Sequence, residues 1–92
     1  MRIVGEIPHP VMKITLFKMD TKYSIKFEDA LFEQTYKFRE GDTIQSIQDI
    51  YKLVDESFLK EVETILQNMK ALSSSALEKA RKNTLDEFEE II

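Results

Sequence analysis

The chain has no cysteine and only one histidine, two glycines and two prolines among its 92 residues. Without cysteine there is no disulfide framework, no thiolate zinc site, no iron–sulfur cluster and no cysteine nucleophile. A zinc site around His9 would need three further ligands, all of them carboxylates, which is an unusual donor set. We therefore expect neither a metal nor a cofactor.

The scarcity of glycine also excludes the common phosphate-binding loops and the nucleophile elbow of serine hydrolases, because each of these motifs needs closely spaced glycines. No calcium-binding loop of alternating aspartates is present. The sequence identifies no catalytic residue, and we expect a protein that is not an enzyme. An enzyme built on His9 with Glu28, Asp29 or Glu33 is the least favoured class, since acid–base catalysis also needs a pocket that shifts their pKa values.

Long hydrophobic runs are absent as well. No segment approaches the roughly 18 apolar residues that a membrane-spanning helix needs. Glu6 and Pro8 come too early for a secretory signal peptide. These observations predict no membrane partner and a cytoplasmic location.

What the chain does contain fits one small globular domain. It has a mass of 10.8 kDa, and 42% of its residues are hydrophobic and 33% charged. The net charge is −4, and all of it falls in residues 43–92, because residues 1–42 hold seven basic and seven acidic side chains. This balance argues against a generic nucleic-acid binder, which carries a broad positive field.

Residues 11–39 alternate between apolar and polar side chains, the pattern of half-buried β-strands. The alternation predicts strands at 11–19, 22–28 and 31–39, joined by breaks too short for a parallel crossover. We expect a three-stranded antiparallel meander, preceded by a stiff Pro8-His9-Pro10 segment. The apolar side of this meander is predicted to carry Ile14, Leu16, Tyr23, Ile25, Phe27, Phe32, Tyr36 and Phe38.

After Gly41 the apolar residues follow a helical period. The spacing predicts one helix over about 44–54, capped by Asp42 or Thr43, and a second over 56–72, capped by Asp55 or Ser57. The apolar stripe of the second helix comprises Phe58, Val62, Ile65, Leu66, Met69 and Leu72.

The triplet Ser73-Ser74-Ser75 is interpreted as a break, followed by a third helix. The fold class predicted is thus α+β: a three-stranded meander over about 11–39, then two or three helices packed on one sheet face. Residues 1–72 form the predicted core domain. Residues 73–92 form a C-terminal helix that belongs either to this domain or to a dimer interface.

The polar side of the meander collects cations. Five cations against two carboxylates, Glu28 and Glu33, leave +3 on this side. Such a surface suits phosphates, single-stranded nucleic acid or an acidic protein, although lysine and threonine are also ordinary residues of a solvated sheet face. The candidate anion-binding face consists of Lys13, Phe17, Lys22, Lys26, Lys37 and Arg39, with Thr15, Ser24 and Thr35 between them.

The last residues of the chain are apolar on one helical side, although chain ends are usually polar. An isolated helix of this length is marginal in water, so it must pack against something. We predict that Leu85, Phe88 and Ile91 contact a second chain. The leading hypothesis is a domain that acts through protein–protein contact, as a homodimer or with another protein partner. The alternative is binding of anions or nucleic acid to the cationic sheet face.

Overall fold

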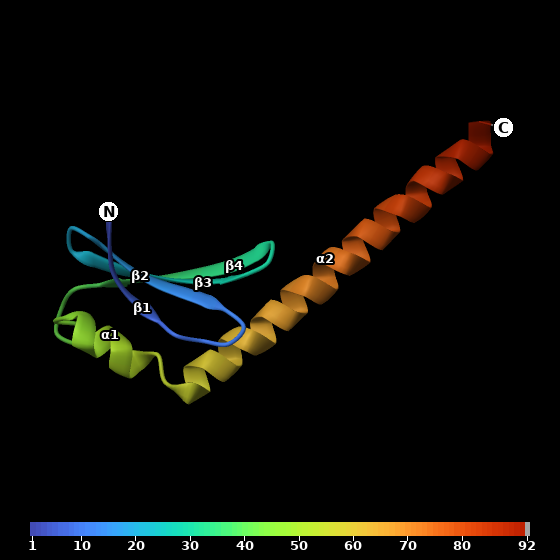
Figure 1. Cartoon of the computed structure of the whole chain (residues 1–92). Coiled ribbons are helices and arrows are strands. Elements are labelled where there is room, and N and C mark those ends of the chain that lie inside the picture. The colour runs from blue at the N-terminus through green and yellow to red at the C-terminus, as the bar shows by residue number, and fades with distance from the viewer. Residues whose placement is uncertain (92) are drawn as a thin grey trace.

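The computed structural model describes the backbone of residues 1–91 and the side chains of residues 1–82. Four antiparallel strands form one sheet in the order β1-β2-β3-β4, followed by two helices (Figure 1). The elements are β1 (Arg2–Ile7), β2 (Lys13–Met19), β3 (Lys22–Asp29), β4 (Phe32–Arg39), α1 (Ile47–Leu53) and α2 (Glu56–Ile91). The α+β class and the meander over β2, β3 and β4 are confirmed.

The prediction of three strands is wrong, because β1 adds a fourth at the edge of the sheet. Its register on β2 shifts between Ile3 and Gly5, so one residue is inserted and the alternation of side chains is interrupted. Gly5 also leaves room for α1, since a Cβ there would overlap the hydroxyl group of Tyr51. An interrupted alternation and a glycine conceal this strand in the sequence.

Two tight turns close the hairpins of the meander. The last pairs of the two hairpins are Met19 with Lys22 and Asp29 with Phe32, so each loop has two residues. The first loop residue is left-handed in both turns, with φ of 48° at Asp20 and 55° at Ala30. Aspartate tolerates this conformation, whereas alanine adopts it at a cost of about 1–2 kcal/mol.

Replacing Ala30 with glycine is therefore expected to raise the free energy of unfolding by about 1 kcal/mol, because glycine has no Cβ to strain at this φ. The same exchange at Ala71, which is exposed on α2, should lower stability by up to about 1 kcal/mol. Urea denaturation followed by circular dichroism measures both. An Ala30→Gly protein less stable than the wild type would contradict the turn geometry.

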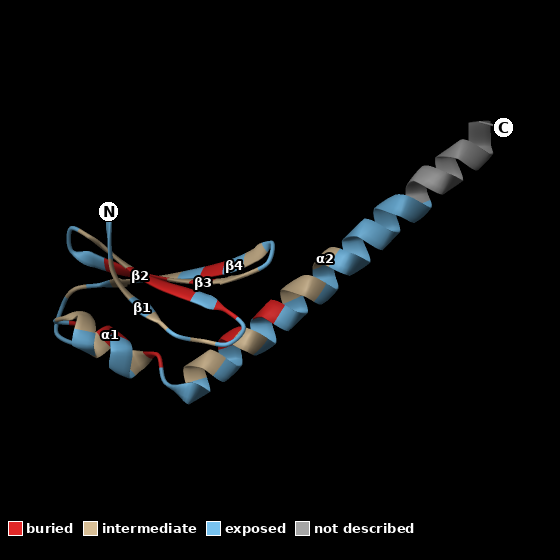
Figure 2. Ribbon diagram, in the orientation of Figure 1, coloured by how far each residue is buried: buried red, intermediate tan, exposed pale blue. Residues whose placement is uncertain are grey.

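The core lies between one face of the sheet and the two helices. Ile14 is paired with Phe27, and Leu16 with Ile25, and all four side chains are at most 2% exposed. The register places the whole predicted apolar set on this inner face, although Phe32, Tyr36 and Phe38 are only partly buried. Figure 2 shows the buried residues gathered in the sheet and in the part of α2 that adjoins it.

Three aromatic rings join the sheet to the start of α2. The ring of Phe27 lies 5.9 Å from Tyr36 and 5.8 Å from Phe58, and Tyr36 lies 5.5 Å from Phe58. Two of these pairs are edge-to-face, a favourable arrangement for aromatic rings. Phe27 is fully buried at the centre of this cluster, whereas Tyr36 is only half-buried.

The first helix begins later than predicted. It starts at Ile47, because the Asp49 carboxylate accepts hydrogen bonds from the backbone N–H groups of Gln45 and Ser46 and so caps the helix after Ser46. The predicted caps Asp42 and Thr43 lie in the loop before it. Asp55 caps α2 as predicted, by accepting a hydrogen bond from Phe58 N–H at 2.9 Å.

The predicted break at Ser73-Ser74-Ser75 is wrong, because α2 runs through the three serines as one helix of 36 residues. Serine lowers helix stability only modestly, and neither glycine nor proline interrupts this segment. The helix passes beyond the sheet and gives the molecule dimensions of 64 × 26 × 20 Å (Figure 1). Two residues of the predicted stripe are not buried: Ile65 is 41% exposed and Leu72 72% exposed.

Candidate functional site

The outer face of the sheet, opposite the helices, is the candidate anion-binding surface. Residues that pair directly across antiparallel strands share a face, and the register brings the predicted residues together in four rows across β2, β3 and β4. These rows are Lys13, Glu28 and Glu33; Thr15, Lys26 and Thr35; Phe17, Ser24 and Lys37; and Met19, Lys22 and Arg39.

Charges on the outer face are partly neutralised within it. Lys26 Nζ lies 3.2 Å from the Glu33 carboxylate and 3.8 Å from that of Glu28. Strand β1 adds Glu6, which pairs with Thr15 on the same face. The five cations therefore face three carboxylates, and the net charge of the outer face is +2 instead of the +3 predicted.

Three of the cations without an ion pair lie together at one end of the outer face. Lys22, Lys37 and Arg39 are exposed and form no ion pair among the described side chains. Phe17 is half-buried and lies in the same row as Lys37. Ile3 of β1 pairs with Phe17 and is 62% exposed. The cations that remain available for a ligand are thus a subset of the predicted six-residue face.

A further ion pair, which the sequence pattern did not reveal, lies on the other face of the sheet. Lys18 Nζ is 2.7 Å from the Glu40 carboxylate and 5.1 Å from the centre of the Tyr23 ring. The hydrogen bond that Lys18 donates lowers the pKa of Glu40, and the same bond raises the pKa of Lys18. Glu40 is therefore engaged away from the cations of the outer face.

The histidine and carboxylates considered for catalysis are not brought together. His9 Nδ1 accepts hydrogen bonds from the backbone N–H groups of Val11 and Met12, both at 3.1 Å, and Nε2 lies 3.0 Å from Glu63 of α2. His9 thus fixes the loop before β2 and links it to α2. Glu28 and Glu33 lie on the outer face, so they are separated from His9 by the sheet.

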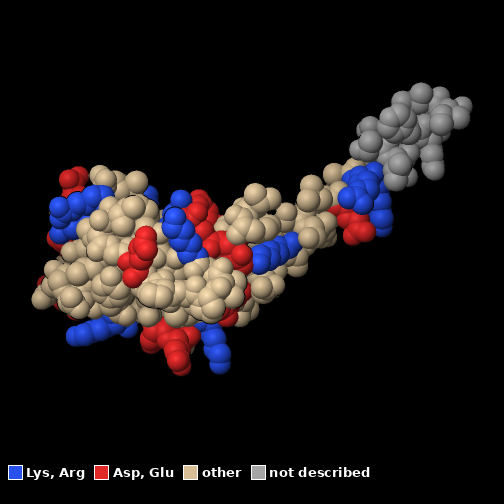
Figure 3. All heavy atoms as spheres, viewed as in Figure 1, with Lys and Arg blue, Asp and Glu red and all other residues tan. Residues whose placement is uncertain are grey.

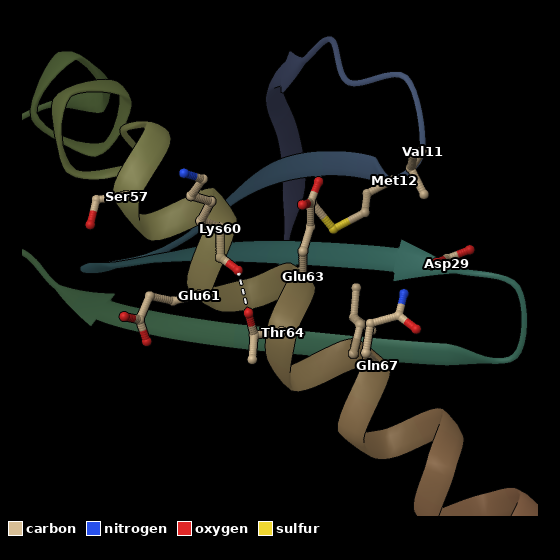
Figure 4. A pocket seen from close by; sticks show the side chains of 10 residues that line it. Val11, Met12, Asp29, Ser57, Lys60, Glu61, Glu63, Thr64 and Gln67 are labelled. Atoms are coloured by element: carbon tan, nitrogen blue, oxygen red, sulfur yellow. Dashed lines mark hydrogen bonds between the residues drawn. The ribbon is translucent and has the colours of Figure 1, made fainter.

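Asp29 lies on the inner face, where its carboxylate binds Lys70 Nζ at 2.6 Å. It borders a groove between α2 and the loop before β2 (Figure 4). The groove has a volume of about 670 Å³ and is lined by exposed polar side chains of α2, including Lys60, Glu61 and Thr64. Thr64 is bonded within the helix to the Lys60 carbonyl group. The groove thus offers no buried reactive group.

The part of α2 that extends past the sheet is the second candidate site. Leu72 and Leu77 are 72% and 66% exposed, and residues 71–77 include no charged side chain. Figure 3 shows this uncharged stretch between the sheet domain and a group of charged side chains further along the helix. The predicted interface residues Leu85, Phe88 and Ile91 lie outside the residues whose side chains the structure describes.

Within the described part of the chain, no group of three or more metal-ligating side chains occurs, and no helix has the length and apolar character needed to cross a membrane. Comparison of the chain with protein-family models, with curated proteins and with solved structures gives no match.

Proposed function

We propose that this protein acts through protein–protein contact and that the extended part of α2 binds a second copy of the chain. The observation that carries the proposal is the exposure of Leu77 on a helix that continues beyond its own domain. A helical segment without tertiary contacts is marginal in water, so packing against another chain would stabilise it. A cytoplasmic location belongs to the same proposal and rests on the sequence alone.

The helical spacing supports a continuous binding surface. Val62 and Leu66 of α2 are buried in the core, Met69 packs against it, and Ser73, one turn further along the same side, is half-buried. On a helix of 3.6 residues per turn, positions 77, 80, 84, 88 and 91 continue the same side. In the sequence these positions are Leu77, Ala80, Thr84, Phe88 and Ile91. The side of α2 that packs on the sheet therefore remains largely apolar past the sheet.

A second copy is favoured over an unrelated partner because this stripe is symmetric in sequence. Its spacings of 3, 4, 4 and 3 residues are the same in both directions from Thr84. Residues 78–82 include three cations and one carboxylate, whereas residues 86–90 include four carboxylates and no cation. Two antiparallel copies centred on Thr84 would place the basic segment of each against the acidic segment of the other. A two-fold interface requires this self-complementarity.

Light scattering over a wide concentration range tests the proposal. The wild type is expected to approach twice 10.8 kDa at high concentration. Combining Leu77→Asp with Phe88→Asp should keep the protein at 10.8 kDa, because two charges would be placed in the apolar stripe. The monomeric variant should also lose part of its helical circular dichroism but retain the cooperative unfolding of the sheet domain.

Ser75→Asp is the matched control for the single Leu77→Asp substitution, since it introduces the same charge in the same helix on the side opposite the stripe. This variant should dimerise like the wild type. A wild type that remains at 10.8 kDa at every concentration contradicts the proposal, as does an equal loss of dimer in the control.

A further inference from the structure

At two places on the outer face, side chains of like charge lie directly opposite each other. A neighbouring side chain of opposite charge neutralises one of these pairs but not the other. Glu28 is directly opposite Glu33, and Lys22 is directly opposite Arg39. Like charges in this position destabilise a sheet. Lys26 bridges the two glutamates, with its Nζ within 4 Å of both carboxylates.

The cationic pair has no such bridge. Lys37 lies two residues from Arg39 on the same face of β4 and adds a third positive charge. Among the described side chains, no carboxylate lies within ion-pair distance of these three cations. The nearby Glu40 is bound to Lys18 on the other face. An anion bound at this end of the outer face would neutralise these three positive charges.

We propose that Lys22, Lys37 and Arg39 form a site for the phosphates of single-stranded nucleic acid, with Phe17 beside them as a platform for a base. Arginine can hold a phosphate through two parallel hydrogen bonds, and lysines act as point charges. Phe17 and Lys37 share a row, with the small side chain of Ser24 between them. An aromatic ring beside cations favours a nucleic acid over an acidic peptide, because each base has a face that can stack.

The proposed site excludes two of the six residues of the predicted face. Lys26 is engaged by two glutamates, and Lys13 is in the row of Glu28 and Glu33 at the other end. The location is also distinct from α2, since the sheet separates the outer face from both helices (Figure 1). An experiment can therefore contradict the nucleic-acid site without contradicting the proposed self-association, and the reverse also holds.

Fluorescence anisotropy with a labelled single-stranded oligonucleotide at several salt concentrations tests the site. Neutralising three phosphates on a single strand predicts a slope of log K against log salt concentration of about −2. The combined Lys22→Gln, Lys37→Gln and Arg39→Gln variant should bind at least tenfold more weakly and lose most of this slope. The control neutralises Lys52 and Lys60, which lie on the helices outside residues 78–82, and should bind like the wild type.

A second ligand, which has no bases, separates the contribution of the Phe17 ring to binding from that of the cations. Phe17→Ala should weaken oligonucleotide binding about tenfold, the lower end of the effect of losing one stacked base, and should leave binding of inorganic polyphosphate unchanged. The proposal is overturned by absence of oligonucleotide binding at low salt or by an equal loss in the helix control. Equal binding of a polyglutamate peptide would likewise overturn it and identify an acidic protein surface as the ligand.

Discussion

Replacing Phe27 with alanine is expected to lower the free energy of unfolding by about 3–5 kcal/mol. Phe27 is completely buried, and its ring contacts Tyr36 in the sheet and Phe58 in α2. Alanine would leave a cavity between the sheet and the helix that neither layer can close without moving. A domain of this size has a total stability of only about 5–10 kcal/mol, so the variant should unfold at a much lower urea concentration.

Two leucines provide the matched comparison. Leu66 is 1% exposed in the core, and Leu31 is 96% exposed at the tip of the β3–β4 hairpin. Leu66→Ala should cost about 2–5 kcal/mol, whereas Leu31→Ala should change stability by less than about 0.5 kcal/mol. Similar denaturation midpoints for the two leucine variants would show that the phase of α2 on the sheet is wrong.

Replacing Gln34 with glutamate is expected to cost about 3 kcal/mol at pH 7. Gln34 is 9% exposed; its Nε2 donates a hydrogen bond to the Val62 carbonyl group at 2.9 Å, and its Oε1 accepts one from the Tyr36 hydroxyl group at 2.5 Å. A carboxylate has no hydrogen to donate to Val62, so a buried charge would face a carbonyl oxygen. The shape of the side chain is almost unchanged, so the effect reports the added charge together with the lost hydrogen bond.

The loss should diminish in acid. Burial raises the pKa of the introduced carboxyl group above its unfolded value of about 4.3. The folded state then binds the proton more tightly than the unfolded state, so the penalty shrinks as the pH falls through the folded pKa and is smallest below the unfolded one. Urea denaturation at pH 7 and pH 4 measures this recovery. Gln67→Glu, on the exposed side of α2, should have little effect, and an equal loss there would contradict the role of Gln34.

The sequence was most informative where one periodicity continued without interruption. Tyr23, Ile25 and Phe27 alternate with Ser24 and Lys26, and both faces of β3 follow from that pattern. The edge strand β1 was missed because its inserted residue moves Ile3 to the outer face, while Ile7 stays on the inner one. A pattern of period two cannot reveal a short strand whose phase changes between Ile3 and Gly5.

The end of the second helix was misjudged for a different reason. Three consecutive serines resemble a loop, but the surrounding alanines, leucines and lysines favour a helix more strongly than the serines oppose it. The alternation of side chains placed the cations on one face, as the register does, yet it did not show which cations are neutralised. That required the register, which places Glu28 opposite Glu33 in the row next to Lys26 and leaves Lys22 opposite Arg39.

The uninterrupted α2 helix would also act as a spacer. The helix leaves the sheet near Lys70, which binds Asp29, and Thr84 lies 14 residues further on. At about 1.5 Å per residue this distance is about 21 Å, so an antiparallel dimer centred on Thr84 would hold its two sheet domains about 42 Å apart. A ligand long enough to span that separation could engage both domains at once and gain from a high effective concentration, whereas a shorter one would bind each domain separately.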